Sequence, residues 1–183
     1  MKHRWLAVGF LGIACMAATA QTAATPMAPM AKEEHEHEHK PTVPSTNLVV
    51  TVDGKPVTLT LEDLQKMPQK IVSVHNAHTK ADETYSGVPL PDLLAKYGVT
   101  TDGEGAHRIY HSYLRAEGTD HYWVLYSASE FETTVHNAEV IVALTLDGKP
   151  LAEDGQFKLV AGAEKKPARW VRNLAALTFV TVE

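Results

Sequence analysis

Residues 48–60 read LVVTVDGKPVTLT, and this stretch decides the fold locally because two β-branched, apolar segments flank an Asp53-Gly54 pair. Aspartate followed by glycine favours the left-handed backbone of a two-residue hairpin turn. The stretch therefore predicts a β-hairpin. A second pair, Asp147-Gly148, follows the strongly apolar run 139–146 and predicts another strand that ends in a turn.

The chain after the first hairpin predicts short helices between short strands. Thr60 is a good N-cap for a helix at 61–67, and an apolar face recurring every three to four residues predicts a second helix at 90–97. Gly98 suits the end of that second helix. Further strands are predicted at 70–75, 82–85, 108–116, 121–126, 157–161 and 177–182. The order is not an alternating βαβ series, so we expect a β-dominated α+β fold.

The first twenty residues have the pattern of a secretory signal peptide. A basic start precedes the apolar stretch 5–17, which is too short to span a bilayer comfortably. Small residues then favour cleavage after Ala20, so we expect a periplasmic or secreted protein with no membrane span after cleavage. The alternative is a lipoprotein acylated at Cys15, which the glycine three positions earlier makes less favourable.

Residues 21–46 are rich in alanine, threonine, proline and charge, and predict a disordered linker ahead of a domain at 47–183. Within the linker, residues 34–39 read EHEHEH. In an extended chain His35, His37 and His39 lie on one side, and the glutamates add negative charge. The tract predicts binding of a divalent metal such as zinc, copper or nickel. The alternative is a solvated linker whose histidines are incidental.

Charge and cysteine content exclude several classes of protein. The full chain has a net charge of −5, and removal of Lys2 and Arg4 with the signal makes it more negative by two. A nucleic-acid partner is therefore not expected, because phosphate binding needs a basic face. The single cysteine, Cys15, lies in the signal, so the mature chain has no disulfide framework and no thiolate.

Three stretches in this order resemble the molybdopterin-binding domain of the sulfite oxidase family. The first, residues 85–94, reads YSGVPLPDLL, and the second, residues 140–151, reads VIVALTLDGKPL. The third begins with GQFKLV at 155–160 and continues with ARWVRNL at 168–174. The resemblance covers roughly residues 47–183. It implies the family's β-dominated fold, an oxidoreductase ancestry and molybdopterin as cofactor.

The resemblance also identifies a departure at the metal site. In catalytically active family members, a cysteine at the end of an early strand binds molybdenum. The closest counterpart of this cysteine here is His75, to within a residue or two. Imidazole suits zinc, copper, nickel or iron better than a high-valent metal that already carries dithiolene sulfur. We therefore expect a cofactor domain without the usual molybdenum catalysis, and whether the chain is an enzyme stays open.

Other candidate residues come from the same resemblance. Arg169 and Arg172 are expected to fork onto a phosphate, with Trp170 gripping a flat ring. The alternative is that Trp170 belongs to the core and the basic residues form a solvated rim. Arg115 and Glu130 lie near positions where family members contact substrate or pterin.

The chain thus supports three hypotheses about function. The first is an exported molybdopterin-binding-like domain that binds a pterin or another anionic small molecule without the usual catalysis. The second is a periplasmic metal- or protein-binding module that kept only the fold. The third is an active oxidoreductase with His75 as an unusual metal ligand.

Overall fold

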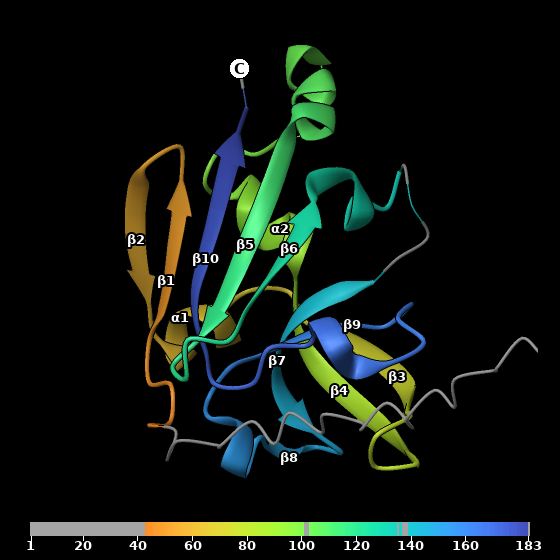
Figure 1. Ribbon diagram of the computed structural model, residues 1–183. Coiled ribbons are helices and arrows are strands. Elements are labelled where there is room, and N and C mark those ends of the chain that lie inside the picture. Colours follow the sequence, from red (N-terminus) through yellow and green to blue (C-terminus); the bar gives the residue numbers. More distant parts are fainter. Residues whose placement is uncertain (1–42, 101–102, 135, 137–138, 183) are drawn as a thin grey trace, which may run out of the picture. The chain divides into compact units, whose positions relative to one another are not determined.

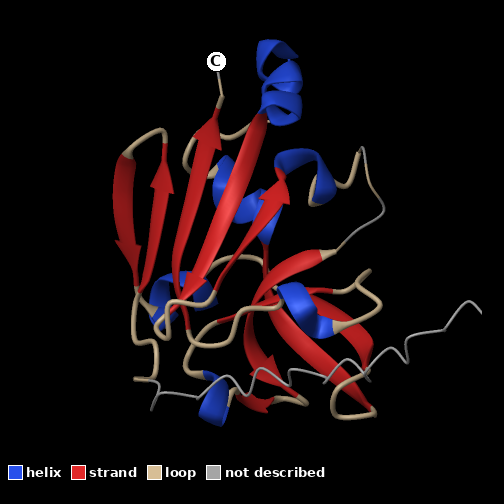
Figure 2. Cartoon of the chain, viewed as in Figure 1, coloured by secondary structure: helices blue, strands red, loops and turns tan. Residues whose placement is uncertain are grey.

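The computed structural model describes residues 43–100, 103–134, 136 and 139–182. Figure 1 shows two β-sheets, and Figure 2 shows how strongly strands outweigh the short helices. The expected β-dominated α+β fold is confirmed. None of the helices in the described part of the chain is long and apolar enough to cross a membrane.

The first sheet has the strand order β2-β1-β10-β5-β6, and only the β1–β10 pair is parallel. Its strands are β1 (Leu48–Val52), β2 (Lys55–Leu59), β10 (Leu174–Thr181), β5 (Ser112–Gly118) and β6 (Trp123–Ser127). The β1–β2 hairpin turns at Asp53 and Gly54, which both have positive φ, as the sequence predicts.

The second sheet has the order β3-β4-β7-β8, and β9 also pairs with β7. Its strands are β3 (Lys70–Asn76), β4 (Ala81–Pro89), β7 (Val140–Leu146), β8 (Lys149–Pro150) and β9 (Lys158–Ala161). All of these pairs are antiparallel. Gly87 lies where β4 pairs closely with β7, since a side chain there would overlap the carbonyl oxygen of Val142.

Short helices connect the strands. They are α1 (Leu61–Gln65), α2 (Leu90–Ala95) and the 3₁₀ segments η1 (Gly103–His111), η2 (Ala128–Glu130), η3 (Ala152–Asp154) and η4 (Pro167–Arg169). Thr60 caps α1 as predicted, in a capping box with Asp63. Both α-helices end two residues before the predicted positions, within the usual uncertainty of helix ends.

Among the strand starts, that of β5 differs most from the prediction. The sequence predicts a strand from residue 108, whereas the chain is helical to His111 and β5 begins at Ser112. Polar contacts explain the difference: the Ser112 hydroxyl donates to the Arg108 carbonyl, and the Arg108 guanidinium bonds to Asp53 and Thr181. The helical turn also buries Ile109.

The core joins the inner sides of both sheets. The central strand β7 is buried from Val140 to Leu144, so it has apolar neighbours on both faces. The largest fully buried side chains include Tyr85, Tyr126, Phe157 and Phe179. Described contacts begin before the expected domain start, because the Ser45 amide donates to Asn173 and Ser45 is buried.

Candidate functional site

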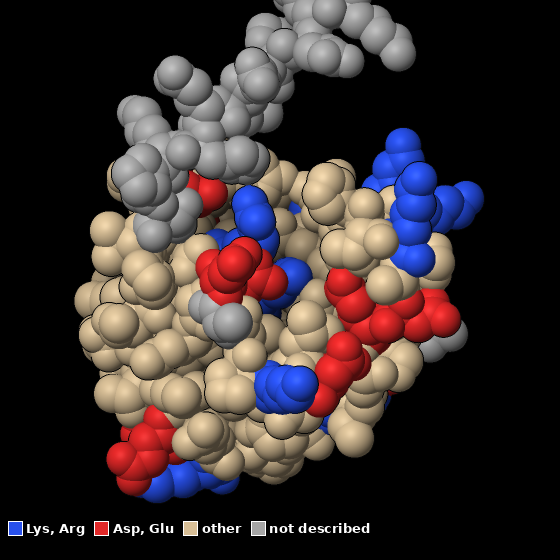
Figure 3. Space-filling model, turned by 90° about the horizontal axis from the view of Figure 1, so that it is seen from below, with Lys and Arg blue, Asp and Glu red and all other residues tan. Residues whose placement is uncertain are grey.

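A cavity of about 790 Å³ lies between the end of the β3–β4 hairpin, β9 and the segment 166–172. Charged and aromatic side chains line it, among them Glu83, Tyr85, Asp154, Lys158 and Trp170. Figure 3, which views the molecule from below, shows basic and acidic side chains gathered around a hollow on that face. Its size suits a ligand of cofactor dimensions.

Strand alternation brings a set of polar groups into this cavity. In β3 the buried positions are Val72, Val74 and Asn76, and the residues between them are exposed. The Asn76 amide donates to both carboxylate oxygens of Glu83, at 3.0 and 2.9 Å. The Thr79 hydroxyl also donates to Glu83, at 2.8 Å. The end of the hairpin is therefore closed by a buried carboxylate that accepts hydrogen bonds on each oxygen.

The hydrogen-bonded carboxylate remains ionised. The Tyr85 hydroxyl donates to Glu83 at 2.6 Å. Burial opposes the charged form of Glu83, but the hydrogen bonds from Tyr85, Asn76 and Thr79 outweigh it and hold its pKa below the ordinary value. Burial and the contact with Glu83 raise the pKa of the Tyr85 hydroxyl far above its ordinary value, so Tyr85 stays a donor.

Lys158 is the buried cation of the cavity. Its ammonium donates to the Tyr85 hydroxyl at 2.9 Å and to the Asp154 carboxylate at 2.8 Å. It also lies 4.9 Å from the ring centroid of Tyr85 and 5.5 Å from that of Trp170, within reach of a cation–π interaction. The Trp170 indole donates to the carbonyl of Ala161, which fixes its ring. We call Asn76, Glu83, Tyr85, Asp154 and Lys158 the floor cluster.

Two further basic residues lie at the cavity rim. Lys166 is exposed there, and the Arg172 Nε lies 3.8 Å from an oxygen of Asp154. Asp154 therefore has Lys158 at one carboxylate oxygen and Arg172 at the other. The three basic side chains at the cavity, Lys158, Lys166 and Arg172, outnumber its two carboxylates and so favour a ligand that carries negative charge.

The structure separates the residues that the resemblance singled out. Trp170 and Arg172 line the cavity. His75 does not: it lies on the exposed face of β3, where its Nδ1 is 2.8 Å from Asp82. Its neighbour Asn76 is the residue at the end of this strand that faces the cavity.

Arg169 does not line the cavity, although its chain neighbours Ala168 and Trp170 do. Its guanidinium bonds to Glu130 and Glu164 and lies 4.4 Å from the ring centroid of Tyr126. Burial opposes the charged form of Glu130, but hydrogen bonds from Arg169 and from the Ser127 amide outweigh it and lower the pKa of Glu130. We call Glu130, Glu164 and Arg169 the latch cluster.

Arg115 has a local role in the first sheet. It forms an ion pair with Glu117 and lies 5.1 Å from the ring centroid of Trp123, away from the residues that line the cavity. His35, His37 and His39 lie outside the described residues. Within the ranges that the structure describes, no group of three or more histidine, cysteine, aspartate or glutamate side chains is arranged to hold a metal ion.

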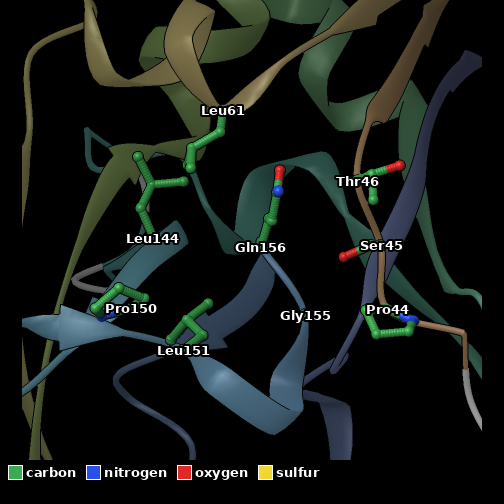
Figure 4. Close-up of a pocket in the computed structure, with 9 residues that line it drawn as sticks. All are labelled: Pro44, Ser45, Thr46, Leu61, Leu144, Pro150, Leu151, Gly155 and Gln156. Carbon is green, nitrogen blue, oxygen red and sulfur yellow. The ribbon is translucent and has the colours of Figure 1, made fainter.

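A second, smaller cavity of about 230 Å³ lies near the start of the described chain (Figure 4). It is lined by proline, leucine and small polar residues, including Leu61, Leu144, Leu151 and Ser45, and by no charged side chain. Without charged or metal-ligating groups it offers little chemistry. The charged cavity is therefore the stronger candidate site.

Sequence reasoning did not single out most of the floor cluster. Lys158 gave a signal, because a lysine inside the apolar stretch FKLVA is unusual and every position of β9 is buried. Asn76 and Glu83 also had a signal, since each falls on the inward side of the period-two pattern of its strand. No local pattern indicated that Asn76 and Glu83 would line the same cavity as Lys158 and Asp154.

A cavity lined by basic and aromatic side chains in a β-dominated domain is typical of a small-molecule site. The model of the oxidoreductase molybdopterin-binding domain family matches residues 37–178. This match covers most of the chain, and the chain belongs to that family. The resemblance read from the sequence is thus confirmed.

The crystal structure of the sulfane dehydrogenase SoxCD from Paracoccus pantotrophus is similar to this chain, with a TM-score of 0.56 and 21% sequence identity. The match covers 73% of this chain and 37% of that chain, so this chain spans little more than a third of the length of the chain it matches. At this identity the similarity shows the fold alone. The comparison with curated proteins gave no match.

Proposed function

We propose that this protein is an exported domain that binds molybdopterin, or a closely similar anionic pterin, in the charged cavity without a thiolate-held molybdenum. Membership of the family and the volume of the cavity support a pterin ligand. Lys158, Lys166 and Arg172 supply positive charge suited to a phosphate group. These residues fit the organic part of the cofactor.

The residues do not fit the metal. The only cysteine in the sequence is Cys15, and the cavity-facing residue at the end of β3 is an amide, Asn76. Both ends of this amide are engaged, because its nitrogen donates to Glu83 and its oxygen accepts from the His78 backbone amide. The absence of a sulfur donor supports a domain that does not carry out the family's usual molybdenum chemistry.

Expression in a host that makes the cofactor tests this proposal. The purified protein should release a fluorescent pterin on denaturation and contain molybdenum well below one equivalent by mass spectrometry of the metal. Arg172→Gln should reduce the pterin content, whereas Lys149→Gln, an exposed change on β8, should not. Stoichiometric molybdenum, or a protein free of pterin that shows no thermal shift with the cofactor, would contradict the proposal.

Export rests on the signal-like N-terminus. The protein recovered from the periplasm should begin at Gln21, and the mass of the intact chain measures this directly. Retention in the membrane that Cys15→Ser abolishes would instead favour the lipoprotein alternative.

A metal-binding role is a second candidate, supported by the alternating EHEHEH tract. The mature chain should bind zinc or copper, and deletion of residues 33–40 should abolish this binding. A bound metal that survives this deletion and is lost in His75→Ala would favour an atypical metal site at His75 instead.

A further inference from the structure

Asp154 lies between the two cations that a bound anion would need. Its Oδ2 accepts from the Lys158 ammonium at 2.8 Å, and its Oδ1 lies 3.8 Å from the Arg172 Nε. The Asp154 side chain is only 16% exposed, so little solvent screens these contacts. One carboxylate thus has a cation at each oxygen, an arrangement that a phosphate or sulfonate group could adopt equally well.

The other acidic group of the cavity is already satisfied. Glu83 accepts hydrogen bonds from Asn76, Thr79 and Tyr85, and no lysine or arginine of the described residues donates to it directly. Lys158 donates to Tyr85 and Asp154, which leaves the third N–H of its ammonium for another acceptor. Asp154 is therefore the acid that limits how much of the positive charge a ligand can use.

We propose that Asp154 is an internal anion that competes with the ligand for Lys158 and Arg172, and so sets the affinity of the cavity for phosphate-like groups. Ligand binding shifts Lys158 and Arg172 from Asp154 toward the ligand. The inference rests on the proposed function only in treating the cavity as an anion site, and it holds for any ligand with a phosphate-like group.

Neighbouring residues provide a matched pair of variants. Asp154→Asn removes the negative charge, keeps the shape and leaves an oxygen that still accepts from Lys158. The backbone contacts of Asp154 with Leu151 and Asn173 do not depend on the side chain, so the fold should persist. Glu153→Gln makes the same change of charge on the same turn, at an exposed side chain.

Calorimetric titration with inorganic pyrophosphate in physiological salt tests the inference. Asp154→Asn should bind at least about tenfold more tightly than the wild type, because a unit charge a few ångströms from the ligand is removed. Glu153→Gln should stay within about twofold. The double variant Asp154→Asn/Lys158→Met should lose the increase in pyrophosphate affinity that Asp154→Asn alone produces. Equal affinity of Asp154→Asn and Glu153→Gln, with native circular dichroism for both, would overturn the inference.

A second measurement uses the wild type and does not depend on how a variant folds. In a crystal of the wild-type protein soaked with pyrophosphate, the Lys158 ammonium should contact the ligand and move beyond hydrogen-bond distance from Asp154. Pyrophosphate bound elsewhere, with the Lys158–Asp154 contact intact, would also overturn the inference. A protein that carries no pterin yet gains pyrophosphate affinity in Asp154→Asn would defeat the proposed function and leave this inference standing.

Discussion

The floor cluster and the latch cluster use the same chemistry in different surroundings. In the floor cluster, Lys158 and Asp154 are 8% and 16% exposed. In the latch cluster, Arg169 and Glu130 are 36% and 37% exposed. Solvent screens the second pair much more than the first, so similar contact distances, 2.8 and 3.0 Å, do not imply equal contributions to stability. The floor cluster lines the cavity, and none of the three residues of the latch cluster does.

The largest effect is expected from breaking the floor cluster at Lys158. Lys158→Met leaves Asp154 without its nearest cation in a poorly hydrated site and removes a donor to Tyr85. We expect the free energy of unfolding to fall by about 3 kcal/mol, as when one partner of a buried ion pair is removed. Urea denaturation followed by tryptophan fluorescence measures the change.

Lys166→Met is the control for that change, since Lys166 lies exposed at the rim of the same cavity. It should alter the unfolding free energy by less than about 0.5 kcal/mol. If Lys158→Met and Lys166→Met lost the same amount of unfolding free energy, burial would not explain the contribution of Lys158 to stability.

A smaller effect is expected within one β-strand. Asn76→Ala removes both side-chain hydrogen bonds from Asn76 to the buried Glu83 and should cost about 2 kcal/mol. His75→Ala breaks a contact with Asp82 in which both side chains are largely exposed, and should cost less than about 0.5 kcal/mol. Thermal denaturation of the two variants gives the comparison. A larger loss for His75→Ala would reverse the assignment of the inward face of β3.

The latch cluster should contribute less to the free energy of unfolding than the floor cluster. Arg169→Ala removes the ion pairs with Glu130 and Glu164 and the contact with the Tyr126 ring, and the Arg169 side chain itself is 36% exposed. We expect a loss of about 1 kcal/mol, and the loss should shrink in high salt. Lys165→Ala, an exposed change nearby, provides the control. A loss as large as that of Lys158→Met would remove the distinction between the clusters.

The structural features that could be predicted from the sequence are those that depend on residues close together in the chain. The Asp53-Gly54 turn and the Thr60 cap depend on contacts within a few positions, and both were predicted correctly. The strand expected from residue 108 starts late because Arg108 bonds to Asp53 and Thr181, and no window of sequence contains all three residues. Such distant contacts decide a short segment whose own preference is weak.

In the candidate site, too, features that depend on neighbouring residues were predictable, whereas those that depend on distant contacts were not. The end of β3 was identified to within one residue, but period-two alternation, applied from Val72 and Val74, would have favoured Asn76 over His75 as the inward side chain. Lys158 and Tyr85 are 73 positions apart, and their contact follows from pairing through β7 rather than from a motif. Arg169 looked like a phosphate ligand because charge alone does not reveal that two glutamates already hold it.

The smallest effect is expected from mild acid, where Glu83 and Glu130 can be compared directly. The pKa of each lies below its ordinary value of 4.5 in the folded protein. Each carboxylate therefore adds stability that is complete above pH 4.5 and is lost as the pH falls through the lowered value. Between pH 7 and pH 3 the unfolding free energy should decline less in Glu83→Gln and in Glu130→Gln than in the wild type. A steeper decline in Glu83→Gln would mean that protonation of Glu83 stabilises the cavity rather than weakening it.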